Sequence, residues 1–227
     1  MTGERAGIAG LLTGRVPVAE IELVTTRLIA LLDTIDASVV NVTAIRGRQA
    51  AIERHIAEVL AGLNEIDAAP PGSIIDVGSG NGIPGLVLGA ARSNRDLHLI
   101  ESVGRKATLI EQAANAMGLT AQIHSDRAEV VANGPLRESS ACVVARALAP
   151  PPVALELCSP LVAVGGRIVL WSRAECDAAL SDVAAQLGLI ALASNPGFLV
   201  FAKASSVAER FPRRTGVAGK RPLRPRM

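Results

Sequence analysis

The sequence predicts an α/β domain whose mostly parallel sheet is covered by helices on both faces. Three observations carry this prediction: β-rich runs alternate with helical stretches from residue 74 onward, a glycine-rich turn follows the first run, and two apolar runs close the alternation. Hydrophobic residues make up 49% of the chain and aromatic residues 2%, so we expect a core of Val, Leu, Ile and Ala. The 227 residues suit one domain with a modest extension.

Residues 1–70 are predicted to form an N-terminal helical extension. Apolar residues recur at helical spacing over Val18–Leu32 and again over Ala51–Leu63. Pro70-Pro71-Gly72 then interrupts the chain and separates this part from the next. No internal repeat of about 20–50 residues is visible, which excludes solenoids and propellers.

Residues 71–204 contain the alternating elements. Strands are expected over Ile74–Val77, Leu97–Ile100, Ala121–His124, Cys142–Ala145, Arg167–Trp171, Leu189–Ala193 and Leu199–Ala202. Helices are expected over Pro84–Ala91, Arg105–Met117, Val153–Leu161 and Cys176–Leu187. The last two strands, joined through Asn195-Pro196-Gly197, are expected to pair as an antiparallel hairpin at the end of the sheet.

Residues 74–85 form the most informative segment, because a buried strand ends there in a glycine-rich turn that opens a helix. Its glycines allow positive φ angles and a close approach of the ligand, and Pro84 fits the first helical turn. Asp76 precedes the turn, where its carboxylate would repel a pyrophosphate but suits the ammonium of a methionine moiety, directly or through water. The cofactor contacts expected here are Asp76, Gly78, Ser79, Gly80, Gly82 and Pro84.

This loop favours S-adenosylmethionine over NAD, and the closing hairpin is usual in class I methyltransferases and unusual in dinucleotide dehydrogenases. We therefore expect a Rossmann-like class I methyltransferase fold with a seven-stranded sheet.

Glu101 ends the second strand, where an acid can accept hydrogen bonds from two ribose hydroxyls; the alternative is a solvated residue that caps the next helix. Ala128 and Glu129 follow the third strand, where the adenine edge would be read. Asp126 is either part of that site or a helix N-cap.

Residues 205–227 form a basic tail. Seven of the 23 Lys and Arg residues lie in residues 210–227, which contain no acid, so residues 1–209 hold 16 bases against 21 acids, a net charge of −5. This asymmetry indicates a polyanionic partner; a disordered, solubilising tail is the alternative.

The three cysteines, Cys142, Cys158 and Cys176, show neither disulfide nor zinc spacing, and no run reaches the roughly 18–20 apolar residues of a membrane helix. We expect a cytoplasmic monomer without metal or membrane contact.

Short motifs over about residues 35–223 resemble the bacterial small-subunit rRNA methyltransferase G family, also called glucose-inhibited division protein B. The matching pieces are Asn41-Val42-Thr43, Arg54-His55, the loop Asp76–Gly85, Glu101-Ser102 with Arg105-Lys106, Arg127-Ala128-Glu129, Arg146-Ala147, and Phe211–Gly216 with Lys220–Leu223. Departures from the family pattern lie on the RNA-facing side, at Glu58, Ala141 and Ser172.

The resemblance implies S-adenosylmethionine-dependent methylation of guanine N7 in the decoding-region loop of 16S rRNA, at guanine 527. The partner would be 16S rRNA or a small-subunit assembly intermediate. Guanine N7 has a free lone pair and no proton, so catalysis needs positioning rather than a general base. Arg146, after the fourth strand, is the candidate catalytic and cofactor-site residue, able to donate to guanine O6 or a phosphate; an ion pair with a neighbouring acid is the alternative. His55 either packs in its helix or lies near the substrate.

The residues expected to bind RNA are Arg105, Lys106, Arg213, Arg214, Lys220 and Arg221. Removal of residues 210–227 should then weaken RNA binding and leave S-adenosylmethionine binding nearly unchanged. Two other functions remain open: a catalytically degenerate RNA-binding module of the same fold, and a methyltransferase for a small molecule or protein. The basic tail argues against the second of these.

Overall fold

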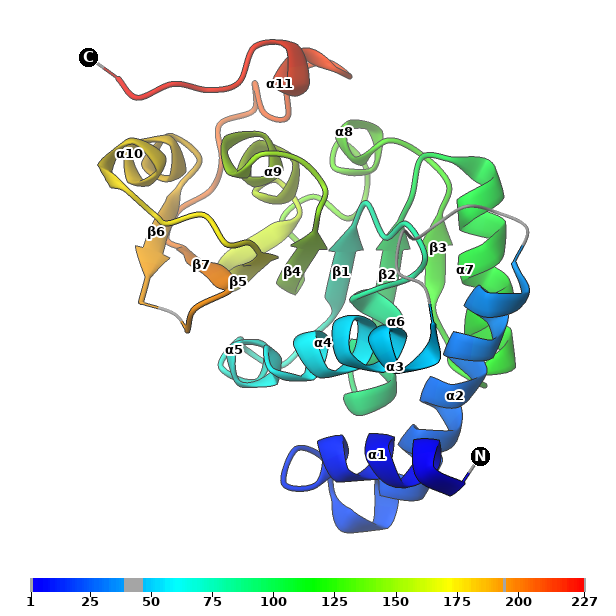
Figure 1. Ribbon diagram of the computed structural model, residues 1–227. Coiled ribbons are helices and arrows are strands. Elements are labelled where there is room, and N and C mark those ends of the chain that lie inside the picture. The colour runs from blue at the N-terminus through cyan, green and yellow to red at the C-terminus, as the bar shows by residue number, and fades with distance from the viewer. Residues whose placement is uncertain (1, 39–46, 194, 227) are drawn as a thin grey trace.

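A computed structural model describes residues 2–38, 47–193 and 195–226 of the chain (Figure 1). Its sheet has the strand order β3-β2-β1-β4-β5-β7-β6. The strands are β1 (Ile74–Val77), β2 (Leu97–Ile100), β3 (Gln122–His124), β4 (Ser140–Arg146), β5 (Val162–Trp171), β6 (Leu189–Leu192) and β7 (Phe198–Lys203). Strands β1 to β5 pair in parallel, and β7 pairs antiparallel with both β5 and β6. The predicted class I methyltransferase fold, including its closing hairpin, is confirmed.

The helices alternate with these strands as the sequence predicts. They are α1 (Thr2–Leu12), η1 (Val18–Glu20), α2 (Ile21–Ala37), α3 (Arg48–Ala51), η2 (Ile52–Ala57), α4 (Glu58–Leu60), α5 (Leu63–Asp67), α6 (Gly85–Ala91), α7 (Gly104–Ala116), α8 (Ala128–Val131), α9 (Pro151–Cys158), α10 (Ala178–Gln186) and α11 (Val217–Lys220). None of these helices is long and apolar enough to span a bilayer.

The two faces of the sheet bury different helices because successive strand residues point to opposite sides. Ile74 packs in a core shared with α1, α2, α4, α6 and α7. Ile75 and Val77 pack in a second core, formed with α9, α10 and the apolar residues of the C-terminal tail. The carboxyl ends of the parallel strands lie at the top of Figure 1, which is the edge where α/β proteins bind ligands.

The N-terminal extension differs from the sequence prediction in two places. Helix α1 was not predicted, and it buries Ile8 and Leu12 against the same core as α2. The single helix expected over Ala51–Leu63 is divided into α3, the π-helical η2 and α4, with a turn before α5. The motif Asn41-Val42-Thr43 lies outside the described residues.

Trp171 joins the N-terminal extension to the sheet. Its indole Nε1 donates a hydrogen bond to the carbonyl oxygen of Glu58 at 3.0 Å, and its ring meets Phe198 edge-on at 5.4 Å. A Cβ on Gly62 would lie 2.8 Å from the Trp171 ring and 2.9 Å from the Phe198 ring. Glycine is therefore required here for the turn between α4 and α5 to pack on the aromatic pair.

The C-terminal tail docks on the domain and crosses α9 and α10, as the red segment of Figure 1 shows. Phe211 and Ala218 are each only 2% exposed. Further along, the side chain of Gln186 donates to the carbonyl of Arg224, and Asp182 accepts from the backbone N–H of Arg226. The tail is thus docked through these residues, in contrast to the disordered tail that composition alone allows.

Candidate functional site

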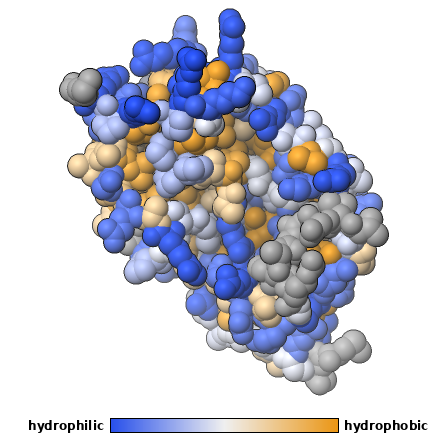
Figure 2. All heavy atoms as spheres, turned by 45° about the horizontal axis from the view of Figure 1, so that its top comes forward, coloured by the Kyte–Doolittle hydropathy of each residue, from blue (hydrophilic) through white to orange (hydrophobic). Residues whose placement is uncertain are grey.

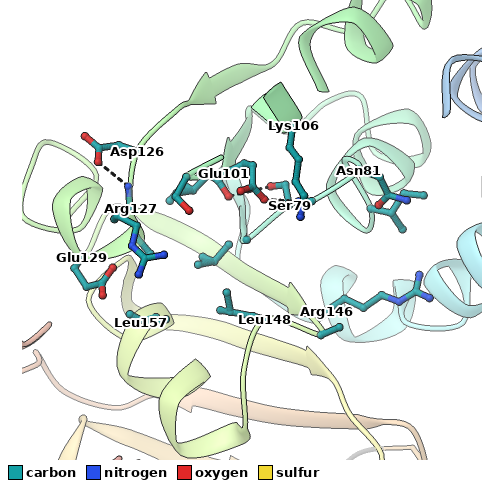
Figure 3. Close-up of a pocket in the computed structure, with 18 of the residues that line it drawn as sticks. Ser79, Asn81, Glu101, Lys106, Asp126, Arg127, Glu129, Arg146, Leu148 and Leu157 are labelled. Atoms are coloured by element: carbon teal, nitrogen blue, oxygen red, sulfur yellow. Dashed lines mark hydrogen bonds between the residues drawn. The ribbon is translucent and has the colours of Figure 1, made fainter. Parts of the chain in front are cut away.

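A cavity of about 500 Å³ opens at the carboxyl ends of β1, β2 and β4. Figure 2 turns this edge toward the viewer and shows hydrophilic residues around patches of hydrophobic ones. The wall includes Gly78, Ser79, Gly80, Asn81, Glu101, Lys106, Asp126, Arg127, Ala128, Glu129, Arg146, Leu148 and Leu157, and His55 from the N-terminal extension. In Figure 3, Asp126, Arg127 and Glu129 lie at one end of the cavity and Arg146 at the other, with Glu101 between them.

The glycine-rich loop forms the floor of this cavity. Gly78 and Gly80 adopt positive φ angles of 72° and 60°. The backbone N–H groups of Gly78 and Ser79 both donate to the carbonyl of Ile100, at 2.8 and 3.0 Å, which joins the loop to the end of β2. A Cβ on Gly78 would lie 2.5 Å from Leu148, so only glycine allows the β4–α9 loop to close over this turn.

Gly82 and Pro84 shape the loop without lining the cavity. Gly82 has a φ of 85°, donates its N–H to the carbonyl of Ser79 at 2.7 Å, and lies so close to Leu86 that a Cβ would clash. Pro84 is the N-cap residue of α6. Both residues therefore stabilise the turn that presents Gly78, Ser79 and Gly80.

Asp76 is fully buried beneath the loop and does not line the cavity. Its Oδ2 accepts a hydrogen bond from the backbone N–H of Gly85 at 2.9 Å, while Oδ1 has no hydrogen-bond partner among the described residues. Burial raises the pKa of this carboxyl to about 7. The structure therefore gives Asp76 a role in fastening the loop to α6, whereas the sequence suggests contact with the cofactor.

Glu101 lies in the cavity wall and is only 6% exposed, which excludes the solvated alternative. Its Oε2 accepts the N–H of Gly80 at 2.9 Å, and its Oε1 accepts the N–H of Val103 at 2.8 Å. Each oxygen of an ionised carboxylate can accept a second hydrogen bond. The carboxylate is thus held rigidly and retains acceptor capacity for a pair of hydroxyls.

The segment after β3 forms the end of the cavity that lies away from Arg146 (Figure 3). Asp126 accepts the N–H of Arg127 at 2.7 Å, so it is not the N-cap of α8; that position is Arg127, whose side chain makes no capping bond. Ala128 and Glu129 both line the cavity. The Oε1 of Glu129 accepts the backbone N–H of Gly216 in the C-terminal tail at 2.9 Å.

Arg146 ends β4 and lines the cavity at the opposite end. Its guanidinium lies 3.3 Å from the carboxylate of Glu58, so the ion pair expected as an alternative role is present together with exposure to the cavity. Ala147, the next residue, has a left-handed φ of 53°, a conformation that costs energy in residues other than glycine. Leu148, which the sequence prediction missed, follows this strained residue and covers Gly78.

His55 lies on the π-helical turn η2, is 4% exposed and reaches the cavity wall. Burial, together with the positive charge of Arg146, lowers the pKa of its imidazole to about 4. This histidine is therefore neutral near pH 7. His98 and His124 lie elsewhere, stacked on each other on β2 and β3 with ring nitrogens 3.2 Å apart, and serve the packing of the sheet edge.

The residues predicted to bind RNA divide into three groups. Lys106 lines the cavity, whereas Arg105 is exposed outside it. The side chains of Arg214, Lys220 and Arg221 are exposed on the tail. Arg213 instead pairs with Glu156, a fully buried carboxylate on α9. Among the described residues, no group of three or more His, Cys, Asp or Glu could hold a metal ion.

Several cavity residues had no signal strong enough to single them out. Asn81 lies within the glycine-rich motif at a position that the pattern leaves variable. Leu157 comes from the last turn of α9, where an apolar residue is expected to join the core. Only the fold brings these side chains to the same cavity as Glu101.

Solved structures with the same fold include a mutant of MtNAS in complex with S-adenosylmethionine. It has a TM-score of 0.53 and 14% identity, over 79% of this chain and 72% of that one. A protein from Methanococcus maripaludis, named for an inferred S-adenosylmethionine-dependent methyltransferase activity, has a TM-score of 0.51 and 14% identity, over 69% of this chain and 90% of that one. At these identities the likeness concerns the fold alone.

Sequence relatives define the family. A ribosomal RNA small subunit methyltransferase G from Pelotomaculum thermopropionicum is 33% identical over 198 residues, which are 81% of this chain and 83% of the relative. One from Chloroflexus aggregans is 32% identical over 197 residues, 81% of this chain and 82% of the relative. The family model for GidB, rRNA small subunit methyltransferase G, matches residues 24–186. This chain therefore belongs to the rRNA small subunit methyltransferase G family.

Proposed function

We propose that this protein methylates N7 of a guanine in 16S rRNA, with S-adenosylmethionine as the methyl donor. Membership of the family makes it an rRNA methyltransferase. The observation that carries the proposal is the position of Glu101, whose carboxylate is held by two backbone N–H groups in the wall of the same cavity that Arg146 reaches. One cavity thus holds a hydrogen-bond acceptor for a nucleoside, Glu101, and a hydrogen-bond donor for a second ligand, Arg146.

The residues present fit S-adenosylmethionine along the length of the cavity. Glu101 has acceptor capacity for the ribose hydroxyls, and Ala128 and Glu129 lie where the adenine would be read. Gly78 and Gly80 let the methionine part approach the backbone closely. We therefore assign cofactor binding to the glycine-rich loop, Glu101 and the start of α8, with Asp76, Gly82 and Pro84 supporting the loop from below.

The cofactor supplies a methyl group on a sulfonium, which a lone pair can displace directly. Guanine N7 offers such a lone pair without losing a proton, so the protein needs to position the base rather than deprotonate it. Neutral His55 and the guanidinium of Arg146 form the adjacent wall. Arg146 can donate to guanine O6 or to a phosphate, and Glu58 limits the orientations of its planar group. We assign Arg146 to substrate positioning.

The RNA would be held by a lysine of the cavity wall and by exposed cations of the C-terminal tail. Lys106 lies in the wall, and the exposed Arg214, Lys220 and Arg221 lie on the docked tail. Such contacts supply affinity that falls with salt and carry no base specificity. Guanine 527 of the decoding-region loop is the proposed target, in free 16S rRNA or in an assembly intermediate of the small subunit. An rRNA substrate would place the reaction in the cytoplasm.

A matched pair of substrates tests the proposed target atom. Unmodified 16S rRNA is transcribed with guanosine or with 7-deazaguanosine, which lacks the N7 lone pair, and incubated with the protein and methyl-labelled S-adenosylmethionine. The proposal predicts incorporation of one methyl group into the first RNA and none into the second. Equal labelling of both RNAs would contradict the N7 assignment. Binding of both RNAs without labelling of either would favour the degenerate RNA-binding module.

A further inference from the structure

The C-terminal tail is fastened to α9 by a buried ion pair. Glu156 is fully buried, and its Oε1 accepts both the backbone N–H of Arg213, at 3.2 Å, and the guanidinium Nε of the same residue, at 2.7 Å. The Nη2 of Arg213 bonds the second carboxylate oxygen and also donates to the carbonyl of Arg221 at 2.8 Å. The hydrogen bonds to Glu156 raise the pKa of Arg213, so this side chain stays charged. Arg213 thus holds both ends of the segment 213–221.

The same segment contacts a wall residue of the cavity through a backbone N–H group. Gly216, three residues after Arg213, donates its N–H to the Oε1 of Glu129 at 2.9 Å. Glu129 is 7% exposed and lines the cavity end that lies away from Arg146 (Figure 3). Gly216 has a left-handed φ of 78°, which turns the chain at this point and begins α11. The Glu129 carboxylate at this end of the cavity is therefore held by a hydrogen bond from the tail.

The tail also separates its cations into two kinds. Arg213 is only 25% exposed at its side chain and is occupied by Glu156. Arg214, its neighbour, is exposed, and none of the hydrogen bonds or ion pairs found in the described residues involves its side chain. Two adjacent residues of one type thus offer a comparison: one fastens the tail, and the other carries only its charge.

We propose that Arg213 and Gly216 are positioning residues for the cofactor. The Arg213–Glu156 pair docks the tail, and the docked Gly216 N–H fixes the Glu129 carboxylate at the nucleoside end of the cavity. A group that strengthens cofactor binding when docked must itself dock more firmly when the cofactor is bound, because coupling between two equilibria is reciprocal. This inference rests on the proposed cofactor and is independent of the RNA substrate. It differs from the expectation that loss of residues 210–227 leaves S-adenosylmethionine binding nearly unchanged.

The first test measures cofactor affinity in the full chain. Arg213→Gln alone leaves Glu156 buried and unpaired, which endangers folding. The informative variant is therefore the double substitution Glu156→Gln with Arg213→Gln, with Arg214→Gln as the control that loses the same tail charge. Isothermal titration with S-adenosylmethionine should give a Kd weakened by at least about fivefold in the double variant, the lower end of usual coupling, and one within about twofold of wild type in the control.

The second test measures the reverse effect. Amide hydrogen exchange is recorded with and without saturating S-adenosylhomocysteine. Exchange at Gly216 should slow on ligand binding in the wild type and in Arg214→Gln, and should not respond in the double variant. A folded double variant with the wild-type Kd overturns the proposal, and so does a Gly216 amide that ignores the ligand in the wild type. Neither measurement uses RNA, so failure of guanine methylation would be seen separately.

Discussion

Gly85 is a residue at which the glycine-rich loop, α6 and Asp76 pack tightly together. A Cβ at this position would lie 2.8 Å from the Oδ2 of Asp76 and 2.8 Å from Leu99. The backbone N–H of Gly85 also donates the hydrogen bond that holds the Oδ2 of Asp76. The sequence motif marks this glycine, and the structure supplies the reason: the helix packs directly on the strand beneath it.

Gly85→Ala should therefore destabilise the protein by about 1–3 kcal/mol, the usual cost of overpacking, and weaken S-adenosylmethionine binding. Gly104→Ala is the matched control, because a Cβ at that helical position would meet nothing within 4 Å. The control should be neutral or gain up to about 1 kcal/mol. Urea unfolding and cofactor titration of both variants check this. Equal unfolding free energies for the two variants would contradict the packing argument.

Asp76 makes stability depend on pH in a predictable direction. Its pKa is raised to about 7 by burial, so the folded state holds the proton more tightly than the unfolded chain does. This stabilising effect is complete below the unfolded-state pKa and is lost as the pH rises through about 7. Asp76→Asn has no such loss, and its amide oxygen can still accept the Gly85 N–H.

The stability of Asp76→Asn relative to wild type should consequently rise between about pH 5 and about pH 8. Urea unfolding of both proteins without cofactor, over that range, measures this difference. A difference that stays constant with pH would show that Asp76 does not titrate in the folded protein as its burial requires.

At the scale of elements, the N-terminal helices complete the cavity only because they are held against the sheet. The Trp171 hydrogen bond to the carbonyl of Glu58 fastens α4 to the end of β5, next to the Glu58–Arg146 pair. The turn at Gly62 allows this close contact. His55 reaches the cavity from the preceding π-helical turn.

Trp171→Phe should keep the aromatic packing and lose the hydrogen bond, at a cost of about 1 kcal/mol. Because Glu58 and His55 face the proposed RNA side, the KM for rRNA should rise while the Kd for S-adenosylmethionine stays unchanged. Ser172→Ala, one residue further on, is the control for stability alone. It loses only an exposed hydrogen bond from the Ala174 N–H and should change stability by less than about 0.5 kcal/mol. A variant that weakens cofactor binding as much as it raises the rRNA KM would contradict this division of the cavity.

Elements with a clear local pattern could be predicted from the sequence, and elements that depend on distant contacts could not. The strands alternate with helices, and the glycine-rich loop lies within one short segment. The order of the elements and the position of the loop can therefore be predicted from the sequence. Helix α1 contains Gly3, Gly7 and Gly10, which lower its intrinsic helix propensity. It forms because Ile8 and Leu12 are buried against the rest of the extension, and such tertiary packing leaves little trace in a short window.

The candidate site shows the same limit. Glu101 is readable because its place after β2 follows from the fold. The tail cations could be recognised by composition, but their roles depend on partners far along the chain: Arg213 meets Glu156, 57 residues away, and Gly216 meets Glu129, 87 residues away. Arg214 has the same side chain as its neighbour Arg213, but it is exposed to solvent and does not pair with Glu156.

At the scale of the whole molecule, the basic tail packs directly on a domain of opposite net charge. Residues 1–209 have a net charge of −5, and residues 210–227 hold seven bases and no acid. The tail crosses α9 and α10 at the top of Figure 1, the edge where the carboxyl ends of the parallel strands lie. Its exposed cations are Arg214, Lys220 and Arg221, and the cavity of about 500 Å³ opens at the same edge. In the proposed function, the methyl donor and the RNA meet at the carboxyl ends of the strands, where Arg146 positions the base. The central claim is that this arrangement methylates a guanine N7 of 16S rRNA.

Mapping of N7-methylguanine in the cell tests that claim most directly. The gene is deleted, and 16S rRNA from the parent, the deletion strain and complemented strains is cleaved with borohydride and aniline, which cut at this modification. The account predicts one cleavage site, at guanine 527, which disappears on deletion, returns with the wild-type gene and stays weak with Arg146→Ala. An unchanged cleavage pattern in the deletion strain would contradict the account.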